Sequence, residues 1–107
     1  GAKLVVVLGH TFCGAIKTAL EELDLGSDIQ SPNLQTIIGN ITPGILDCLN
    51  DTDSFDEKIN KAVRANIQTT IDNIQNESPI LRQLQAESGL KIVGAEYCLE
   101  NGTVEFL

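Results

Sequence analysis

A run of five apolar residues near the start of the chain, residues 4–8 (Leu-Val-Val-Val-Leu), constrains the fold more than any other feature. Such a continuous, valine-rich run is typical of a strand buried on both faces, as in a parallel sheet. Gly9 ends the run, and the apolar spacing beyond it predicts a helix over residues 12–23. Ligands of open α/β sheets bind at the carboxyl edge of the strands, so the turn after this strand is the first candidate site.

Two residues of this turn carry side chains that bind metals. His10 is the only histidine of the chain, and Cys13 follows three residues later at the start of the predicted helix. The positive end of a helix dipole favours thiolate, and zinc prefers imidazole and thiolate ligands. Packing without a metal is the alternative for both side chains. A zinc site needs at least one more protein ligand, and the chain has neither a second histidine nor a Cys-x-x-Cys motif.

The remaining residues predict more helices and two further strands. Gly26 is expected to stop the first helix and to open a polar loop over residues 26–32. A helix should begin at Pro32, and Pro43 should end or kink it before a short helix that runs to about residue 49. A capping box, Ser54 with Glu57, predicts the longest helix, over about residues 55–76. Ser78-Pro79 predicts the start of another helix, which has Ile80, Leu81 and Leu84 facing inward and is capped by Gly89. A buried strand is expected over residues 90–97. The pair Asn101-Gly102 predicts a hairpin turn, followed by an edge strand over residues 104–107.

Composition narrows the class of protein. The chain has 107 residues, one domain at most, and its core must be aliphatic because it holds no Trp and one Tyr. The formal net charge of −8 argues against binding to nucleic acid or to an anionic membrane surface. Three cysteines without a disulfide framework, no signal peptide and no membrane-spanning run favour a cytoplasmic protein.

Residues 9–15, Gly-His-Thr-Phe-Cys-Gly-Ala after a valine-rich strand, resemble the second zinc-ligand motif of the β-class carbonic anhydrases. The resemblance continues in the same order through the segments 33–45, 65–67, 78–81, 90–97 and 101–104. It therefore spans nearly the whole chain. Each segment is weak alone, and the ordered set favours metal ligation over packing for His10 and Cys13.

The resemblance implies a fold, a cofactor and an activity. The fold is α/β, a mostly parallel sheet flanked by helices, with residues 1–107 as the C-terminal portion of a β-carbonic anhydrase-like domain. His10 and Cys13 would bind Zn²⁺, and Thr11 and Gly14 would shape the pocket. The complete domain would hydrate CO2 reversibly to bicarbonate. Members of this class form dimers or multiples of dimers, so we expect a homodimer or a larger assembly.

One part of the family pattern is missing from this chain. The first half of the family's domain carries a Cys-x-Asp-x-Arg motif, which supplies the remaining thiolate ligand and an Asp–Arg pair beside the metal. No such motif occurs here. We therefore expect the 107-residue chain to be inactive alone.

Other interpretations of the sequence stay open at this stage. A non-catalytic regulatory or assembly module with the same fold, attached to an anion transporter, is the main alternative. A nucleotide-binding domain is disfavoured, because Gly9 and Gly14 flank the turn without a Gly-x-Gly-x-x-Gly or Gly-Lys-Ser/Thr motif. Cys98 stands where the family usually has an aspartate, and we expect it at a hairpin rather than on zinc. Cys48 is expected to pack as a small buried residue.

Overall fold

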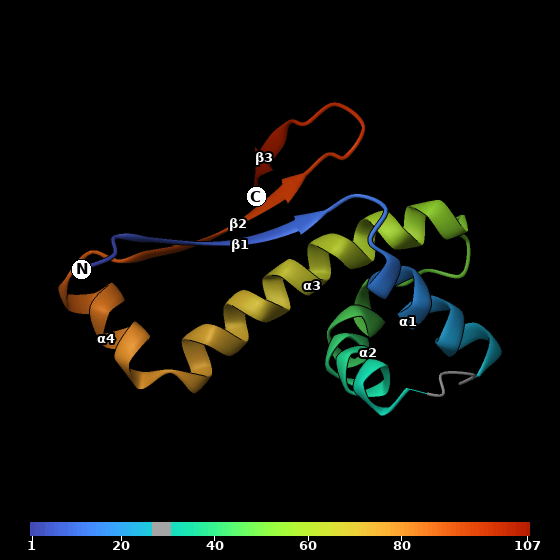
Figure 1. Cartoon of the computed structure of the whole chain (residues 1–107), viewed down its shortest axis with the longest axis horizontal. Helices are drawn as coiled ribbons and strands as arrows, with labels where there is room; N and C mark the ends of the chain where they lie inside the picture. Colours follow the sequence, from blue (N-terminus) through green and yellow to red (C-terminus); the bar gives the residue numbers. More distant parts are fainter. Residues whose placement is uncertain (27–30) are drawn as a thin grey trace.

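The structure, a computed structural model, describes residues 1–26 and 31–107 (Figure 1). The predicted loop over residues 26–32 falls mostly outside the described residues. The elements follow in the order β1 (Leu4–His10), α1 (Gly14–Leu25), α2 (Pro32–Ile45), the 3-10 helix η1 (Leu46–Cys48), α3 (Phe55–Glu77), α4 (Pro79–Glu87), β2 (Lys91–Tyr97) and β3 (Val104–Phe106). The predicted α/β class is confirmed.

The described strands form one sheet in the order β1-β2-β3. β1 and β2 are parallel and in register from Leu4 opposite Lys91 to His10 opposite Tyr97. β3 returns antiparallel to β2 through the predicted hairpin, in which Gly102 adopts a positive φ of 73°. The carboxyl ends of β1 and β2 therefore meet at one edge of the sheet, beside this hairpin.

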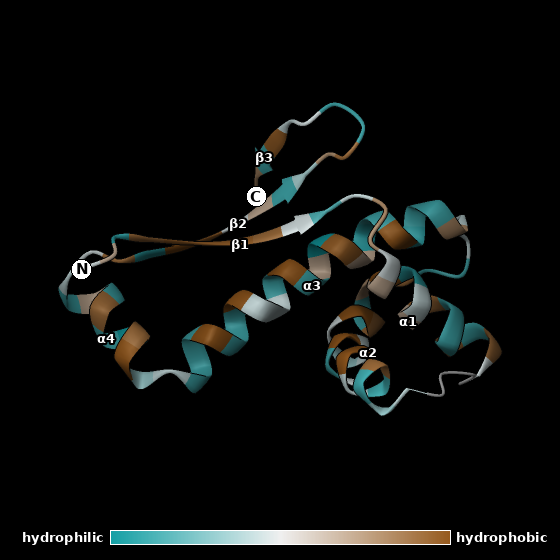
Figure 2. Ribbon diagram, viewed as in Figure 1, coloured by the Kyte–Doolittle hydropathy of each residue, from teal (hydrophilic) through white to brown (hydrophobic). Residues whose placement is uncertain are grey.

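One face of the sheet packs on helices and the other is open (Figure 1). Side chains of β1 alternate between half-buried and exposed, and Leu4, Val6 and Leu8 are 53%, 41% and 56% exposed. The expectation of a strand buried on both faces is wrong for this chain, because the described helices cover only one face. Figure 2 nevertheless shows that β1 and β2 are hydrophobic along most of their length.

Helix α3 packs on the covered face of the sheet. Its buried side chains are Ile59, Ala62, Val63, Ile67 and Ile71, and the buried residues of α1 and α2 pack on its other side. Ile67 lies against both parallel strands at positions that lack side chains. A Cβ on Gly9 would lie 2.6 Å from Ile67 Cδ1, and a Cβ on Gly94 would lie 2.7 Å from Ile67 Cγ2. The two glycines thus let the sheet approach α3 closely.

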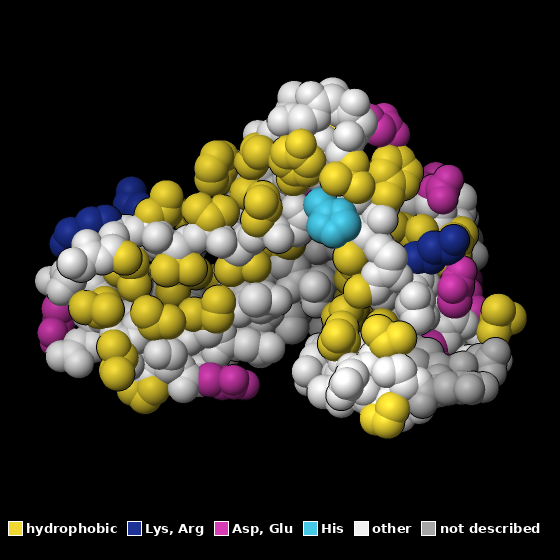
Figure 3. Space-filling model, in the orientation of Figure 1, with side chains coloured by type: hydrophobic (Ala, Val, Ile, Leu, Met, Phe, Trp, Pro, Cys, Tyr) yellow, Lys and Arg dark blue, Asp and Glu magenta, His cyan; other side chains and the backbone are white. Residues whose placement is uncertain are grey.

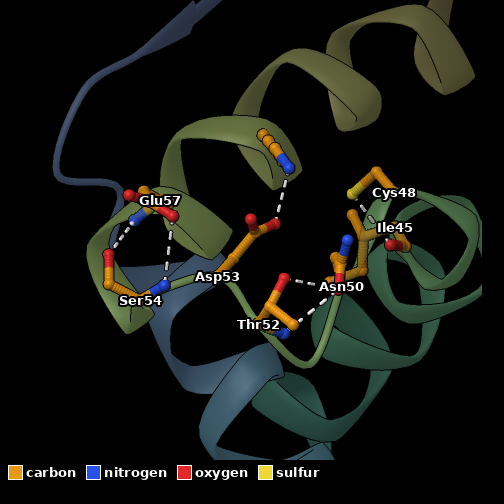
Figure 4. A network of polar contacts seen from close by, with 8 residues as sticks. Ile45, Cys48, Asn50, Thr52, Asp53, Ser54 and Glu57 are labelled. Carbon is orange, nitrogen blue, oxygen red and sulfur yellow. Dashed lines mark hydrogen bonds and ion pairs between the residues drawn. The ribbon is translucent and has the colours of Figure 1, made fainter.

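The start of α3 is fixed by local hydrogen bonds (Figure 4). Glu57 N donates to Ser54 Oγ, and Ser54 N donates to a carboxylate oxygen of Glu57, so the predicted capping box is confirmed. In the preceding turn, Thr52 donates through both its backbone N–H and its hydroxyl to Asn50 Oδ1. Lys61 pairs with Asp53 across the first turns of the helix.

Three predicted helix details are wrong. α1 begins at Gly14 rather than at residue 12, because Phe12 adopts a left-handed φ of 56° that no helix continues. α2 runs through Pro43 to Ile45, so the proline does not end it, while the short helix predicted up to about residue 49 is present as η1. On α4, Ile80 is 71% exposed and Leu84 is 38% exposed, because the described chain places no element against that side of the short helix.

Replacing Gly94 by alanine is expected to lower the free energy of unfolding by about 1–3 kcal/mol, because the new methyl group would crowd the buried Ile67. The matched control is Gly39→Ala on α2, where a Cβ meets nothing within 4 Å. That change should instead stabilise the helix by about 0.5–1 kcal/mol. Urea unfolding followed by circular dichroism measures both, and equal effects would contradict the close approach at Ile67.

Candidate metal centre

The turn from β1 to α1 is held at the carboxyl edge of the sheet by Thr11. Its backbone N–H donates to Tyr97 O at 3.0 Å, which extends the parallel pairing by one residue. Its hydroxyl oxygen accepts from Leu99 N at 3.0 Å, which ties the turn to the β2–β3 hairpin. Two segments far apart in the sequence therefore fix the position of the residues on either side of Thr11.

His10 is the last residue of β1, not the residue just past it, and its side chain is exposed. In Figure 3 the single histidine, in cyan, lies at the surface among hydrophobic side chains. Its Nδ1 lies 2.8 Å from Thr11 O. A carbonyl oxygen only accepts, so Nδ1 carries the proton in this hydrogen bond and Nε2 of the neutral ring keeps its lone pair. This is the tautomer in which a histidine binds a metal through Nε2.

Cys13 is the N-cap residue of α1, as predicted for a cysteine at a helix N-terminus. It is a free cysteine, and its side chain makes no capping hydrogen bond. It is half-buried against the core and borders a cavity of about 340 Å³ together with Phe12, Phe55 and Ile59. Lys17 and Asp56 complete the lining, so the sulfur borders a hollow with both apolar and charged side chains.

The described residues do not complete a metal site. They contain no group of three or more His, Cys, Asp or Glu side chains that could hold an ion. Cys98 stands at the hairpin, where its N–H donates to Thr103 O, and it borders a cavity of about 300 Å³ with Thr11 and Phe12. Its sulfur thus lies near the turn without joining a cluster of three ligands.

Cys48 belongs to the core rather than to a metal site. Its thiol donates to Ile45 O at 3.0 Å (Figure 4), and burial raises the pKa of the Cys48 thiol. Both features keep the proton on the sulfur, whereas a zinc ligand must lose it. The structure agrees here with the expected packing role.

The two residues predicted to shape the pocket differ in their surroundings. Thr11 borders two cavities at the turn, one with Cys98 and one with Arg64. Gly14 opens α1 with free space around it, since a Cβ there would meet nothing within 4 Å. A pocket role for either residue stays a prediction.

Two features of this edge were not predicted from the sequence. Phe12 is a left-handed, 64% exposed aromatic residue, and nothing in the spacing of His10 and Cys13 signals it. The second feature is Arg64 on α3, which donates to Glu96 at 3.2 Å and to Glu105 at 2.8 Å. Partial burial lowers the pKa of Arg64, but the hydrogen bonds to Glu105 and Glu96 outweigh it and raise the pKa above its ordinary value. These two ion pairs, called here the Arg64 fork, join α3 to β2 and β3.

Comparison with known proteins shows which family this chain belongs to. Residues 1–104 match the family model described as carbonic anhydrase. The chain is 34% identical over 106 residues to a carbonic anhydrase of Mycolicibacterium smegmatis, a match that covers 95% of this chain and 48% of that protein. The chain belongs to the β-carbonic anhydrase family. It is also 27% identical over 103 residues to carbonic anhydrase 2 of Mycobacterium tuberculosis, covering 92% of this chain and 46% of that relative.

Solved β-carbonic anhydrases share the fold. One of the two tetrameric enzymes from Sordaria macrospora superposes with a TM-score of 0.78 at 23% identity, over 99% of this chain and 52% of that one. The Coccomyxa β-carbonic anhydrase in complex with acetazolamide gives a TM-score of 0.75 at 24% identity, over 98% and 46%. The chain therefore spans about half the length of the family members it matches. It has the fold of a partial β-carbonic anhydrase domain, and none of its described helices has the length and hydrophobicity needed to cross a bilayer.

Replacing Phe12 by glycine is expected to raise the free energy of unfolding by up to about 1 kcal/mol, because glycine adopts the left-handed conformation without strain. The control is Phe12→Ala, which also removes the exposed ring but keeps the unfavourable φ. Chemical unfolding of the two variants side by side measures the difference. An equal stability of both variants would contradict backbone strain at this turn.

Proposed function

We propose that this chain supplies two of the protein ligands of a zinc-dependent carbonic anhydrase, and that the complete enzyme converts CO2 and water to bicarbonate. The observation that carries the proposal is the hydrogen bond from His10 Nδ1 to Thr11 O, which leaves Nε2 available. Cys13 follows on the same turn as an uncommitted sulfur at a helix N-terminus. Membership of the family supports zinc as the metal.

The donor set fits zinc better than other common divalent ions. One imidazole nitrogen and one cysteine sulfur are ligands of the kind that zinc selects, whereas Mg²⁺ and Ca²⁺ prefer oxygen. When bound at such a site, zinc supplies the Lewis acidity that lets a water molecule lose a proton near neutral pH. The third protein ligand would come from outside the described residues, as the cysteine of the Cys-x-Asp-x-Arg motif does in the family.

The residues around the two ligands have distinct roles in this proposal. Thr11 fixes the ring of His10 through its carbonyl oxygen, and its hydroxyl anchors the turn to Leu99. CO2 is small and has no net dipole, so the apolar side chains of Phe12 and Ile59 on the wall of the cavity beside Cys13 suit its approach. His10 and Cys13 hold the metal and take no part in proton transfer.

We further propose that the protein acts in the cytoplasm as a homodimer or a larger assembly. Three free cysteines in the described residues are compatible with a reducing compartment. Oligomers are also common among related enzymes, as the tetrameric Sordaria macrospora proteins illustrate.

A fusion protein tests the proposed activity. The stretch of the Mycolicibacterium smegmatis relative that this chain does not match would be joined to residues 1–107. Stopped-flow measurement should show chelator-sensitive CO2 hydration, and His10→Ala or Cys13→Ser should reduce it to the buffer rate. Cys98→Ser is the matched control and should leave it unchanged. A correctly folded, zinc-containing fusion without activity would favour a non-catalytic module instead.

The 107-residue chain alone is expected to show no CO2 hydration above the buffer rate. Titration with Co²⁺ should still reveal weak binding, with a sulfur-to-cobalt charge-transfer band that Cys13→Ser abolishes and Cys48→Ser leaves intact. This difference is expected because the thiol of Cys48 is engaged with Ile45 O. Chelator-sensitive hydration by the chain alone would show that the site is complete without a further ligand.

A further inference from the structure

Helices α1 and α2 border a cavity that the proposed metal centre does not use. The two helices pack against each other (Figure 1), and with Leu46 of η1 they line a hollow of about 390 Å³, called here the α1–α2 cavity. Its lining shares no residue with the cavities that border Thr11 and Cys13. Cys13 is the N-cap of α1, whereas Glu22 and Leu23, which line the α1–α2 cavity, lie in its last turn. An occupant would therefore sit apart from the metal.

The cavity has room because small residues line it on both helices. Ala19 of α1 and Gly39 of α2 both border it, and a Cβ on Gly39 would meet nothing within 4 Å. Ala19 and Ile38 belong to the buried core, and Leu23 and Leu46 extend the apolar lining to the exposed surface. The volume lies at the lower end of the range for small-molecule sites. It suits a molecule built on a single ring.

One charged group interrupts this apolar lining. Of the described residues that line the cavity, Glu22 alone is charged. Its Oε2 atom is buried and accepts no hydrogen bond from any residue that the structure describes. The hydroxyl of Thr42, which also lines the cavity, donates to Ile38 O at 2.9 Å instead. A buried carboxylate oxygen without a donor is costly, and a positively charged donor relieves that cost most strongly.

The surroundings of Glu22 favour a cation. The negative end of the α1 dipole lies at this end of the helix, and the last turn of α1, which the structure describes fully, carries no basic residue. The lysine of α1, Lys17, pairs with Glu21 at 3.9 Å rather than with Glu22. The formal net charge of −8 on the chain also attracts cations from solution.

We propose that the α1–α2 cavity binds a small organic cation, with an amidinium or guanidinium head on Glu22 and an apolar body against Ala19 and Ile38. A planar head of this kind can donate two N–H bonds to one carboxylate. A bare metal ion fits less well. Glu22 belongs to no group of three or more His, Cys, Asp or Glu side chains in the described ranges that could hold an ion. The proposal does not depend on carbonic anhydrase activity.

An NMR titration of the ¹⁵N-labelled 107-residue chain with benzamidine tests the proposal. Benzamidine should bind saturably, with a dissociation constant of about 1 mM or below, and shift the amide signals of Ala19 and Gly39 but not those of β2. Benzamide has nearly the same shape without the charge. It should bind about tenfold or more weakly, because it makes no charged hydrogen bond to Glu22. Equal affinity of the two compounds, or shifts that do not saturate, would overturn the proposal.

Two variants locate the site. Glu22→Gln keeps the shape of the side chain without its charge, and should reduce benzamidine binding to the level of benzamide. Glu21→Gln is the matched control, because it removes the same charge one residue away at a side chain that does not line the cavity. It should weaken binding by about twofold at most, since exposed charges are screened.

The second variant, Gly39→Leu, adds a side chain where the helix leaves open space, and should abolish binding while circular dichroism stays unchanged. This substitution tests the cavity independently of Glu22. An equal loss of benzamidine affinity in Glu21→Gln and Glu22→Gln, or undiminished binding to Gly39→Leu, would show that the cation does not occupy the α1–α2 cavity.

Discussion

The contact of Ile67 with two glycines, one on each parallel strand, determines how the sheet lies on α3. Because Gly9 and Gly94 have no side chains, β1 approaches the helix closely one residue before its carboxyl end, and β2 does so at its middle. Gly9 is followed by His10, the last residue of β1, and by the turn that begins at Thr11, so the packing of the core positions the residues proposed as metal ligands. The capping box at Ser54 fixes where α3 starts and thereby which of its residues face the strands.

The turn from β1 to α1 is held by hydrogen bonds at Thr11 and has a strained backbone at Phe12. Thr11 is held from two sides by the β2 strand and the hairpin beyond it, and Phe12 adopts a left-handed backbone between them and α1. This conformation ends the strand and starts the helix within three residues, and it leaves Cys13 at the N-cap. Strained backbone at such a position is common where side chains must be aimed at a ligand.

Local patterns in the sequence predicted most of the elements but not their surroundings. The apolar run before Gly9, the Ser54–Glu57 box and the Asn101-Gly102 turn depend on neighbouring residues, and all three predictions are confirmed. The expected burial of β1 on both faces depends on what packs there, and a strand pattern does not contain that information. The left-handed Phe12 and the Arg64 fork likewise arise from tertiary contacts. Residue type and spacing make His10 and Cys13 candidate ligands, and the family resemblance favours metal binding over packing, but the tautomer of His10 follows only from its contact with Thr11 O.

X-ray absorption at the zinc edge of the zinc-loaded fusion protein measures whether His10 and Cys13 bind the metal. If they do, each zinc should have one imidazole nitrogen at about 2.0–2.1 Å and two sulfurs at about 2.3 Å. Cys13→Ser should remove one sulfur, and His10→Ala should remove the imidazole signal. A zinc shell that lacks sulfur, or one that neither substitution changes, would contradict the assignment of His10 and Cys13 as ligands.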